Sequence, residues 1–121
     1  MQTHTLFELH EHLRRVVALN YPAPLWVTAE IAQISRSRGH VYLELVQKNA
    51  EPDGELVAQA QAVIWQRAYQ KMRLEKGLLL DEVLQEGREV QALAQVDFHE
   101  RYGFKLLLQD VDTAYTLGAR R

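Results

Sequence analysis

Basic and aromatic side chains occur together in one short stretch of this 121-residue chain. Arg36 and Arg38 lie in a polar segment, and His40 and Tyr42 follow at alternate positions. Cations attract phosphates, whereas flat aromatic rings stack on bases that are not already stacked in a duplex. Residues of these types at this spacing therefore indicate binding of single-stranded nucleic acid.

Further residues of the same two kinds occur at two later places in the chain. The first place is the end of an alternating apolar segment, and the second is a turn that contains a glycine. The candidates at these places are Trp65, Arg67, Lys71, Arg101, Tyr102 and Lys105. If the fold gathers them beside residues 36–42, they line one groove. Such contacts predict weak to moderate affinity with a strong salt dependence.

Each candidate also has a purely structural interpretation. Tyr42 and Trp65 could pack as core beneath a helix, because an exposed Trp is uncommon. Trp26 fits packing against a helix or a barrel end better than stacking on a base. The basic residues that follow Trp65 could be the solvated face of a helix. Solvent exposure is expected mainly for Arg36 and Arg38, because a turn carries them.

Patterns typical of catalysis and metal binding are missing from the sequence. The chain has no Cys, which excludes thiolate zinc sites, iron–sulfur clusters and cysteine nucleophiles. His10 and His12 are two residues apart on a predicted helix and therefore face different sides. There is no glycine-rich phosphate loop and no nucleophile elbow. We therefore expect no catalytic residue, no metal and no cofactor in this chain.

The net charge of −2 argues against a nucleic-acid ligand, because domains that bind nucleic acids are usually basic. The charges are, however, arranged in blocks. Residues 31–48, 62–77 and 101–121 are net positive, whereas residues 49–61 and 78–100 are net negative. If the positive blocks meet in the fold, their local potential attracts an anion despite the small total. A mixed, solvated surface is the alternative interpretation.

The candidate residues are positioned by a predicted order of one helix, three strands, a helical segment and two strands. Thr5 and Glu8 form a capping-box pattern at the start of a helix over about residues 5–20. Alternating apolar residues predict strands within residues 26–31, 40–46, 58–65, 90–98 and 104–108. Turns are expected at residues 35–39, 49–54 and 99–103, and a helical segment interrupted at Gly77 is expected over residues 66–85.

Five strands with a helix between the third and the fourth follow the order of the OB-fold, a small Greek-key barrel. We therefore predict a mainly β protein, a five-stranded OB-fold barrel with an N-terminal helix and a helical segment between strands 3 and 4. The expected division is an N-terminal helix at residues 1–22, a nucleic-acid-binding OB-fold at residues 23–112, and a tail or linker at residues 113–121. In this fold, ligands bind strands 2 and 3 and the loops joining strands 1 to 2 and 4 to 5.

One long stretch resembles a known family. Residues 25–45, LWVTAEIAQISRSRGHVYLEL, are similar to the N-terminal domain of the exodeoxyribonuclease VII large subunit. The positions that carry this similarity are Trp26, Val27, Glu30, Ile31, Ser35, Arg36, Gly39, His40 and Tyr42. The resemblance continues through residues 62–67 and 86–96 to a tail reading DVDTAYTLG. Residues 66–85 are longer than the connection that is usual in the family.

The resemblance implies a domain that binds single-stranded DNA and guides it to a nuclease domain. The nuclease residues of the family lie beyond the part that this chain matches, so the chain alone is not expected to be an enzyme. The expected partners are single-stranded DNA, the remainder of the large subunit and the exonuclease VII small subunit, with self-association left open. The alternative is a protein-interaction module that docks subunits or domains without binding nucleic acid, because fold does not fix function.

The sequence also predicts the compartment. Its apolar runs fall far short of the roughly 20 residues that a membrane span needs. The N-terminal residues lack the apolar core and small-residue cleavage site of a signal peptide. We therefore expect a cytoplasmic protein with no membrane partner.

Overall fold

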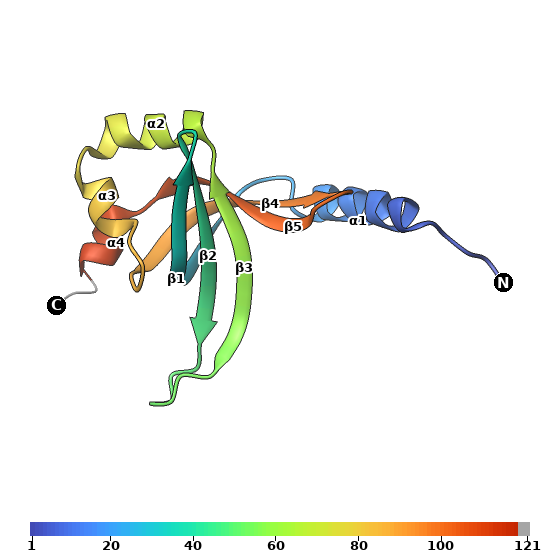
Figure 1. Cartoon of the computed structure of the whole chain (residues 1–121), viewed down its shortest axis with the longest axis horizontal. Coiled ribbons are helices and arrows are strands. Elements are labelled where there is room, and N and C mark those ends of the chain that lie inside the picture. The colour runs from blue at the N-terminus through green and yellow to red at the C-terminus, as the bar shows by residue number, and fades with distance from the viewer. Residues whose placement is uncertain (119–121) are drawn as a thin grey trace.

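Apolar side chains at alternate positions fold most of the chain into a five-stranded barrel. The computed structural model of the protein describes residues 1–118. The strands are β1 (Leu25–Ser37), β2 (His40–Lys48), β3 (Leu56–Ile64), β4 (Glu89–His99) and β5 (Gly103–Val111). The predicted order of one helix, three strands, a helical segment and two strands is confirmed (Figure 1).

The barrel closes through one short parallel contact. The strand order around it is β1-β2-β3-β5-β4. Neighbouring strands are antiparallel except β3 and β5, which are parallel and pair at Ala62 with Leu106 and at Val63 with Leu107. This contact makes β2, β3 and β5 neighbours on one outer face.

The interior of the barrel is filled mainly by aliphatic side chains. Ile31 and Ile64 are 0% exposed, and Val41 and Val90 are 1% exposed. Removing such side chains from water is the main stabilising contribution to a fold of this size. Because successive side chains of a strand point to opposite faces, the buried positions also determine which residues face outward.

Helices cover one end of the barrel and one side of it. α2 (Gln66–Lys76) and α3 (Leu79–Val83) connect β3 to β4 and are separated at Gly77, as predicted. Their side chains Met72, Leu80 and Val83 are at most 1% exposed and join the barrel core. α1 (Leu6–Asn20) instead lies along the β4–β5 hairpin, and none of its residues is buried (Figure 1).

The predicted capping box at the start of α1 is confirmed. Thr5 Oγ1 accepts a hydrogen bond from the Glu8 N–H at 3.1 Å, and Glu8 Oε1 accepts one from the Thr5 N–H at 3.0 Å. The hydrogen bond from the Thr5 N–H to the Glu8 carboxylate, and then the Thr5 hydroxyl, lower the pKa of Glu8 below its ordinary value of 4.5. The resulting stabilisation is present at neutral pH and is lost as the pH falls through the lowered pKa.

The turn between β1 and β2 is shorter than predicted. Residues 35–37 belong to β1 and pair with residues 40–42 of β2, so that Arg38 and Gly39 alone form the turn. Both have positive φ, 54° and 83°, as a two-residue hairpin turn of type I′ requires. The predicted turn over residues 35–39 was wrong because the polar end of β1 has no apolar alternation to mark it as strand.

The predicted tail also differs from the structure. Residues 113–118 form a short helix, α4 (Thr113–Gly118). Asp112 Oδ1 accepts a hydrogen bond from the Tyr115 N–H at 3.2 Å, and Thr116 Oγ1 donates one to the Glu89 carbonyl at 2.8 Å. Polar contacts therefore hold this segment against β4. Because such contacts need no regular repeat of apolar residues, the sequence did not indicate a helix here. The last residues of the predicted tail, 119–121, lie outside the described part of the chain.

Replacing Gly39 by Ala is expected to lower the free energy of unfolding by about 1–2 kcal/mol, the cost of a left-handed backbone for a residue with a Cβ. The added Cβ would also lie 2.9 Å from Cγ of Gln66. Urea denaturation measures the change. Gly118→Ala is the matched control, because an added Cβ there meets no atom within 4 Å. Equal losses in the two variants would contradict the prediction.

Candidate nucleic-acid interface

Three of the predicted aromatic residues form one cluster on the outer face of the barrel. His40 and Tyr42 are on β2, and Trp65 directly follows β3. The ring centroids of His40 and Trp65 are 5.0 Å apart, and Tyr42 lies 6.3 Å from each of them, all in edge-to-face arrangements. Tyr42 remains 40% exposed and Trp65 39% exposed. The structure therefore brings these three rings together at one surface, and Tyr42 and Trp65 are not core residues beneath α1.

The cluster rests on an apolar residue of β3. Val63 lies directly opposite Tyr42 on β2 and beside Leu107 on β5. Directly opposite residues share a face of the sheet, so Val63 belongs to the outer face. It is nevertheless 2% exposed, which means that the surrounding side chains cover it. Val63 therefore provides a covered apolar position beside Tyr42 on the outer face.

A predicted cation lies against the same cluster. Lys105 is on β5, and its Nζ atom is 5.0 Å from the centroid of the Trp65 ring. An ammonium group at this distance over an indole face is attracted by the quadrupole of the ring. The parallel pairing of β3 with β5 is what brings these two residues together. The structure therefore places aromatic faces and a cation side by side.

His40 also has a structural role that the sequence analysis missed. Its Nδ1 accepts a hydrogen bond from the backbone N–H of Gln66 at 2.9 Å. That N–H belongs to the first turn of α2, where the N-cap residue Trp65 forms no side-chain cap. His40 therefore caps α2 from the neighbouring strand. In the neutral ring, the proton must then be on Nε2.

Arg36 is exposed, as predicted, but it forms an ion pair with an acidic side chain of α3. Its Nη2 atom lies 3.7 Å from Oδ1 of Asp81, and its guanidinium is 5.4 Å from the centroid of the Tyr69 ring. Asp81 also accepts a hydrogen bond from the Tyr69 hydroxyl at 2.6 Å and pairs with Arg73 at 3.1 Å. Asp81 therefore gathers the end of β1 and α2 around one carboxylate. No local sequence pattern indicates this role of Asp81, because its partners lie on β1 and α2.

The other predicted cations near this end of the barrel are exposed. Arg38 is in the β1–β2 turn, and Arg67 and Lys71 are on α2. Within residues 1–118, no acidic side chain forms an ion pair with any of these three. The β1–β2 turn and α2 lie together at one end of the barrel, whereas the acidic β2–β3 loop over residues 49–55 lies at the opposite end (Figure 1).

Arg101 and Tyr102 lie apart from the β1–β2 turn. They form the tip of the β4–β5 hairpin beside α1, on another side of the molecule (Figure 1). Tyr102 is 69% exposed. Its ring stacks on His99 at 5.0 Å, and the Arg101 guanidinium is 5.5 Å from its centroid. This is a second aromatic and cationic group, connected to the first along β5 through Lys105.

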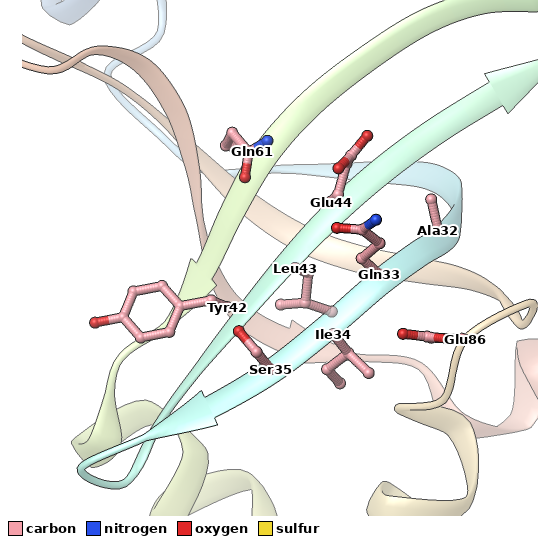
Figure 2. Close-up of a pocket in the computed structure, with 9 residues that line it drawn as sticks. All are labelled: Ala32, Gln33, Ile34, Ser35, Tyr42, Leu43, Glu44, Gln61 and Glu86. Carbon is pink, nitrogen blue, oxygen red and sulfur yellow. The ribbon is translucent and has the colours of Figure 1, made fainter.

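A polar hollow borders the aromatic cluster on the β1–β2 side. It has a volume of about 390 Å³ and is lined along β1 and β2, with Tyr42 at one end (Figure 2). The carboxylates of Glu44 and Glu86 belong to its walls. Glu44 accepts a hydrogen bond from Gln59 of β3. Two carboxylates make this hollow unfavourable for a phosphate.

The barrel and its outer face agree with a known family. A family model described as an OB-fold nucleic acid binding domain matches residues 4–112. The chain belongs to this family. The predicted OB-fold is thereby confirmed, and the aromatic cluster lies where strands 2 and 3 of such a fold present their ligand face.

A curated relative confirms the resemblance that starts at residues 25–45. This OB domain is 35% identical over 118 residues to the exodeoxyribonuclease 7 large subunit of Deinococcus radiodurans. The match covers 93% of this chain and 28% of the relative. The chain therefore spans less than a third of the length of that protein.

Two solved structures align with most of the OB domain. One is Rim1, a mitochondrial single-stranded DNA binding protein from S. cerevisiae, with a TM-score of 0.48, 10% identity and coverage of 74% of this chain and 91% of that chain. The other is Schizosaccharomyces pombe Pot1pC bound to ssDNA, with a TM-score of 0.46, 12% identity and coverage of 71% and 68%. Similarities of this size support no conclusion about the ligand of this chain.

The described residues of the OB domain contain neither a membrane-spanning helix nor a metal-binding cluster. Among residues 1–118, no helix is long and apolar enough to cross a membrane. In this part of the chain, no group of three or more His, Cys, Asp or Glu side chains is placed to hold a metal ion. The candidate site is the outer face of β2, β3 and β5, where the aromatic cluster and Lys105 lie.

His40→Ala is expected to lower the free energy of unfolding by about 0.5–2 kcal/mol, the range for loss of a helix cap. The loss should appear in global unfolding, because α2 contributes Met72 to the barrel core. Urea denaturation followed by circular dichroism measures it. His12→Ala, on the exposed side of α1, is the control and should change stability by less than about 0.5 kcal/mol. An unchanged midpoint for His40→Ala would show that the bond to Gln66 contributes nothing.

Proposed function

We propose that this OB domain binds single-stranded DNA on the outer face of β2, β3 and β5. The observation that carries the proposal is the cluster of His40, Tyr42 and Trp65 with the Lys105 ammonium over the Trp65 ring. Aromatic faces can stack on bases only where the bases are unpaired and unstacked, so the cluster favours a single strand over a duplex. The adjacent cations neutralise phosphates and make binding dependent on salt.

The charges around the cluster define a path for the strand. Arg38, Arg67 and Lys71 provide positive charge at the β1–β2 turn and α2. Glu44 and Glu86 oppose phosphates on the β1–β2 side. The strand therefore enters near the basic end, passes over the aromatic rings and continues across β3 toward β5.

The relative supports a role for this domain within a larger protein. The 35% identity to an exodeoxyribonuclease 7 large subunit supports a domain that holds substrate for a nuclease. In this proposal, the OB domain binds the strand and other parts of the nuclease hydrolyse it. The partners are the rest of a large subunit and a small subunit, and the compartment is the cytoplasm.

Fluorescence anisotropy with a labelled single-stranded oligonucleotide at low salt tests the proposal. Binding that weakens steeply with salt and exceeds binding to the matching duplex is the expected result. No binding at high micromolar protein would reject it. Sedimentation of the same sample distinguishes DNA binding from the alternative function. A tight dimer that does not bind DNA would favour a protein-interaction module.

Trp65→Ala is expected to weaken binding by about 5- to 150-fold, equivalent to one lost stacking contact of roughly 1–3 kcal/mol. Trp26→Ala is the matched control, because Trp26 is similarly exposed at 47% but lies at the start of β1, outside the cluster. Anisotropy titrations at one salt concentration compare the two variants. A similar loss in both would move the stacking site away from the cluster.

Asp81→Asn is expected to strengthen binding by up to about fivefold, the scale of one partly exposed ion pair. The change keeps an acceptor for the Tyr69 hydroxyl and removes the charge that holds Arg36 and Arg73. Asp53→Asn removes the same charge from the β2–β3 loop at the opposite end of the barrel. Equal changes in affinity for the two variants in anisotropy titrations would mean that the net charge of the protein, and not the release of Arg36 and Arg73, changes the affinity.

A further inference from the structure

The turn between β4 and β5 is held by polar contacts to α1. The ring Nδ1–H of His10 donates a hydrogen bond to the Glu100 carbonyl at 2.8 Å. Arg14 Nη1 donates to both carboxylate oxygens of Glu100 at 3.2 Å. The His10 ring also meets Phe98 of β4 edge to face at 5.3 Å. Two residues one helical turn apart on α1 therefore hold one residue of the turn.

The held turn presents a flat aromatic stack next to a cation. The rings of His99 and Tyr102 are 5.0 Å apart with an interplanar angle of 28°. His99 Nδ1 accepts a hydrogen bond from the Arg101 N–H at 3.0 Å, which fixes the backbone of the turn. The Arg101 guanidinium lies 5.5 Å from the Tyr102 ring centroid. An aromatic stack with a cation is the combination that stacks unpaired bases and contacts phosphates.

This turn is within reach of a strand that crosses the aromatic cluster. Tyr102 precedes Lys105 by three residues, which is about 10 Å along an extended chain. Lys105 itself lies over Trp65 of the cluster. A single strand that leaves Trp65 in the direction of Lys105 and follows β5 therefore arrives at the His99–Tyr102 stack.

The loop between strands 4 and 5 belongs to the ligand site of an OB-fold. We propose that His10 and Arg14 of α1 are positioning residues, which hold this turn through Glu100 so that the His99–Tyr102 stack can receive the same single strand. The proposal rests on the proposed function. α1 has no buried residue, so its polar contacts with Glu100 are a specific feature of its docking. A turn held in its binding conformation loses less entropy when a ligand binds, which strengthens binding without any new contact.

Glu100 is the informative residue, because its charge is of the wrong sign for a site that binds phosphates. A hydrogen bond from its own backbone N–H, and then the charge of Arg14, lower the pKa of Glu100 below its ordinary value of 4.5. Glu100 is therefore charged at neutral pH, and the contact with Arg14 is lost only as the pH falls through the lowered pKa. Electrostatics alone predicts tighter DNA binding when Glu100 is removed. A positioning role predicts weaker binding.

The test compares short and long labelled oligothymidylates, of about 4 and 12 nucleotides, by anisotropy at pH 7. The wild type is expected to bind the long strand more tightly, because only the long strand reaches both stacks. Arg14→Ala and Glu100→Ala should each weaken binding of the long strand by about three- to tenfold, less than the loss of a whole stacking contact. Both should leave the short strand unaffected and the thermal unfolding of the barrel unchanged.

Matched variants separate positioning from direct contact. Arg15→Ala is the control, since Arg15 is the next residue on α1 and its one ion pair within residues 1–118 is with Glu11 of the same helix. It should affect neither oligonucleotide. Combining Arg14→Ala with Glu100→Ala should weaken binding no further than either change alone, because both break one contact. If Arg14 instead contacted a phosphate, Arg14→Ala would reduce the slope of the logarithm of the binding constant against the logarithm of the salt concentration by about 0.7.

Two outcomes overturn the inference, and another rejects the proposed function instead. If Glu100→Ala binds the long strand as tightly as the wild type or more tightly, the turn is not a positioned stacking site. If Tyr102→Ala leaves binding of the long strand unchanged, no base stacks there. If the wild type binds neither oligonucleotide, the function proposed for the whole outer face fails.

Discussion

The parallel pairing of β3 with β5 is the contact on which the candidate interface depends. Two registered pairs close the barrel and make β5 a neighbour of β3. Without them, Lys105 would not lie over Trp65, and Val63 would have no neighbour to cover it from the β5 side. The β4–β5 turn would likewise be unconnected to the aromatic cluster. A small number of backbone contacts therefore joins the groups of β5 and the β4–β5 turn to the aromatic cluster.

Several residues of the interface support the fold and the surface at the same time. His40 caps α2 with one ring nitrogen while its ring packs on Trp65. Asp81 holds Arg36 near the turn while it binds Tyr69 and Arg73 of α2. Such shared contacts hold the surface groups in place before any ligand arrives. They also mean that a substitution here must be tested for stability before a loss of binding is interpreted.

The sequence predicted what depends on short-range periodicity and missed what depends on long-range pairing. Alternation by two was enough to place His40 and Tyr42 on the outer face, and the order of elements was enough to predict the barrel. The contact of Lys105 with Trp65 joins residues far apart in the chain through a parallel pairing that no local pattern encodes. The ion pair between Asp81 and Arg36 was missed for the same reason, because it joins two elements that are far apart in the chain. α4 was missed because Asp112 begins it with a hydrogen bond and not with an apolar repeat.

The placement of the acidic β2–β3 loop opposite the basic β1–β2 turn has a kinetic consequence. A chain with a net charge of only −2 still has a large dipole moment when its charged groups are concentrated at opposite ends. In the field of a polyanion such a molecule turns its basic end forward before contact, so more of the collisions begin in a productive orientation. Association is then accelerated relative to a molecule with the same groups evenly mixed. Because salt screens this orientation over about 10 Å, the association rate should fall more steeply with ionic strength than the net charge suggests.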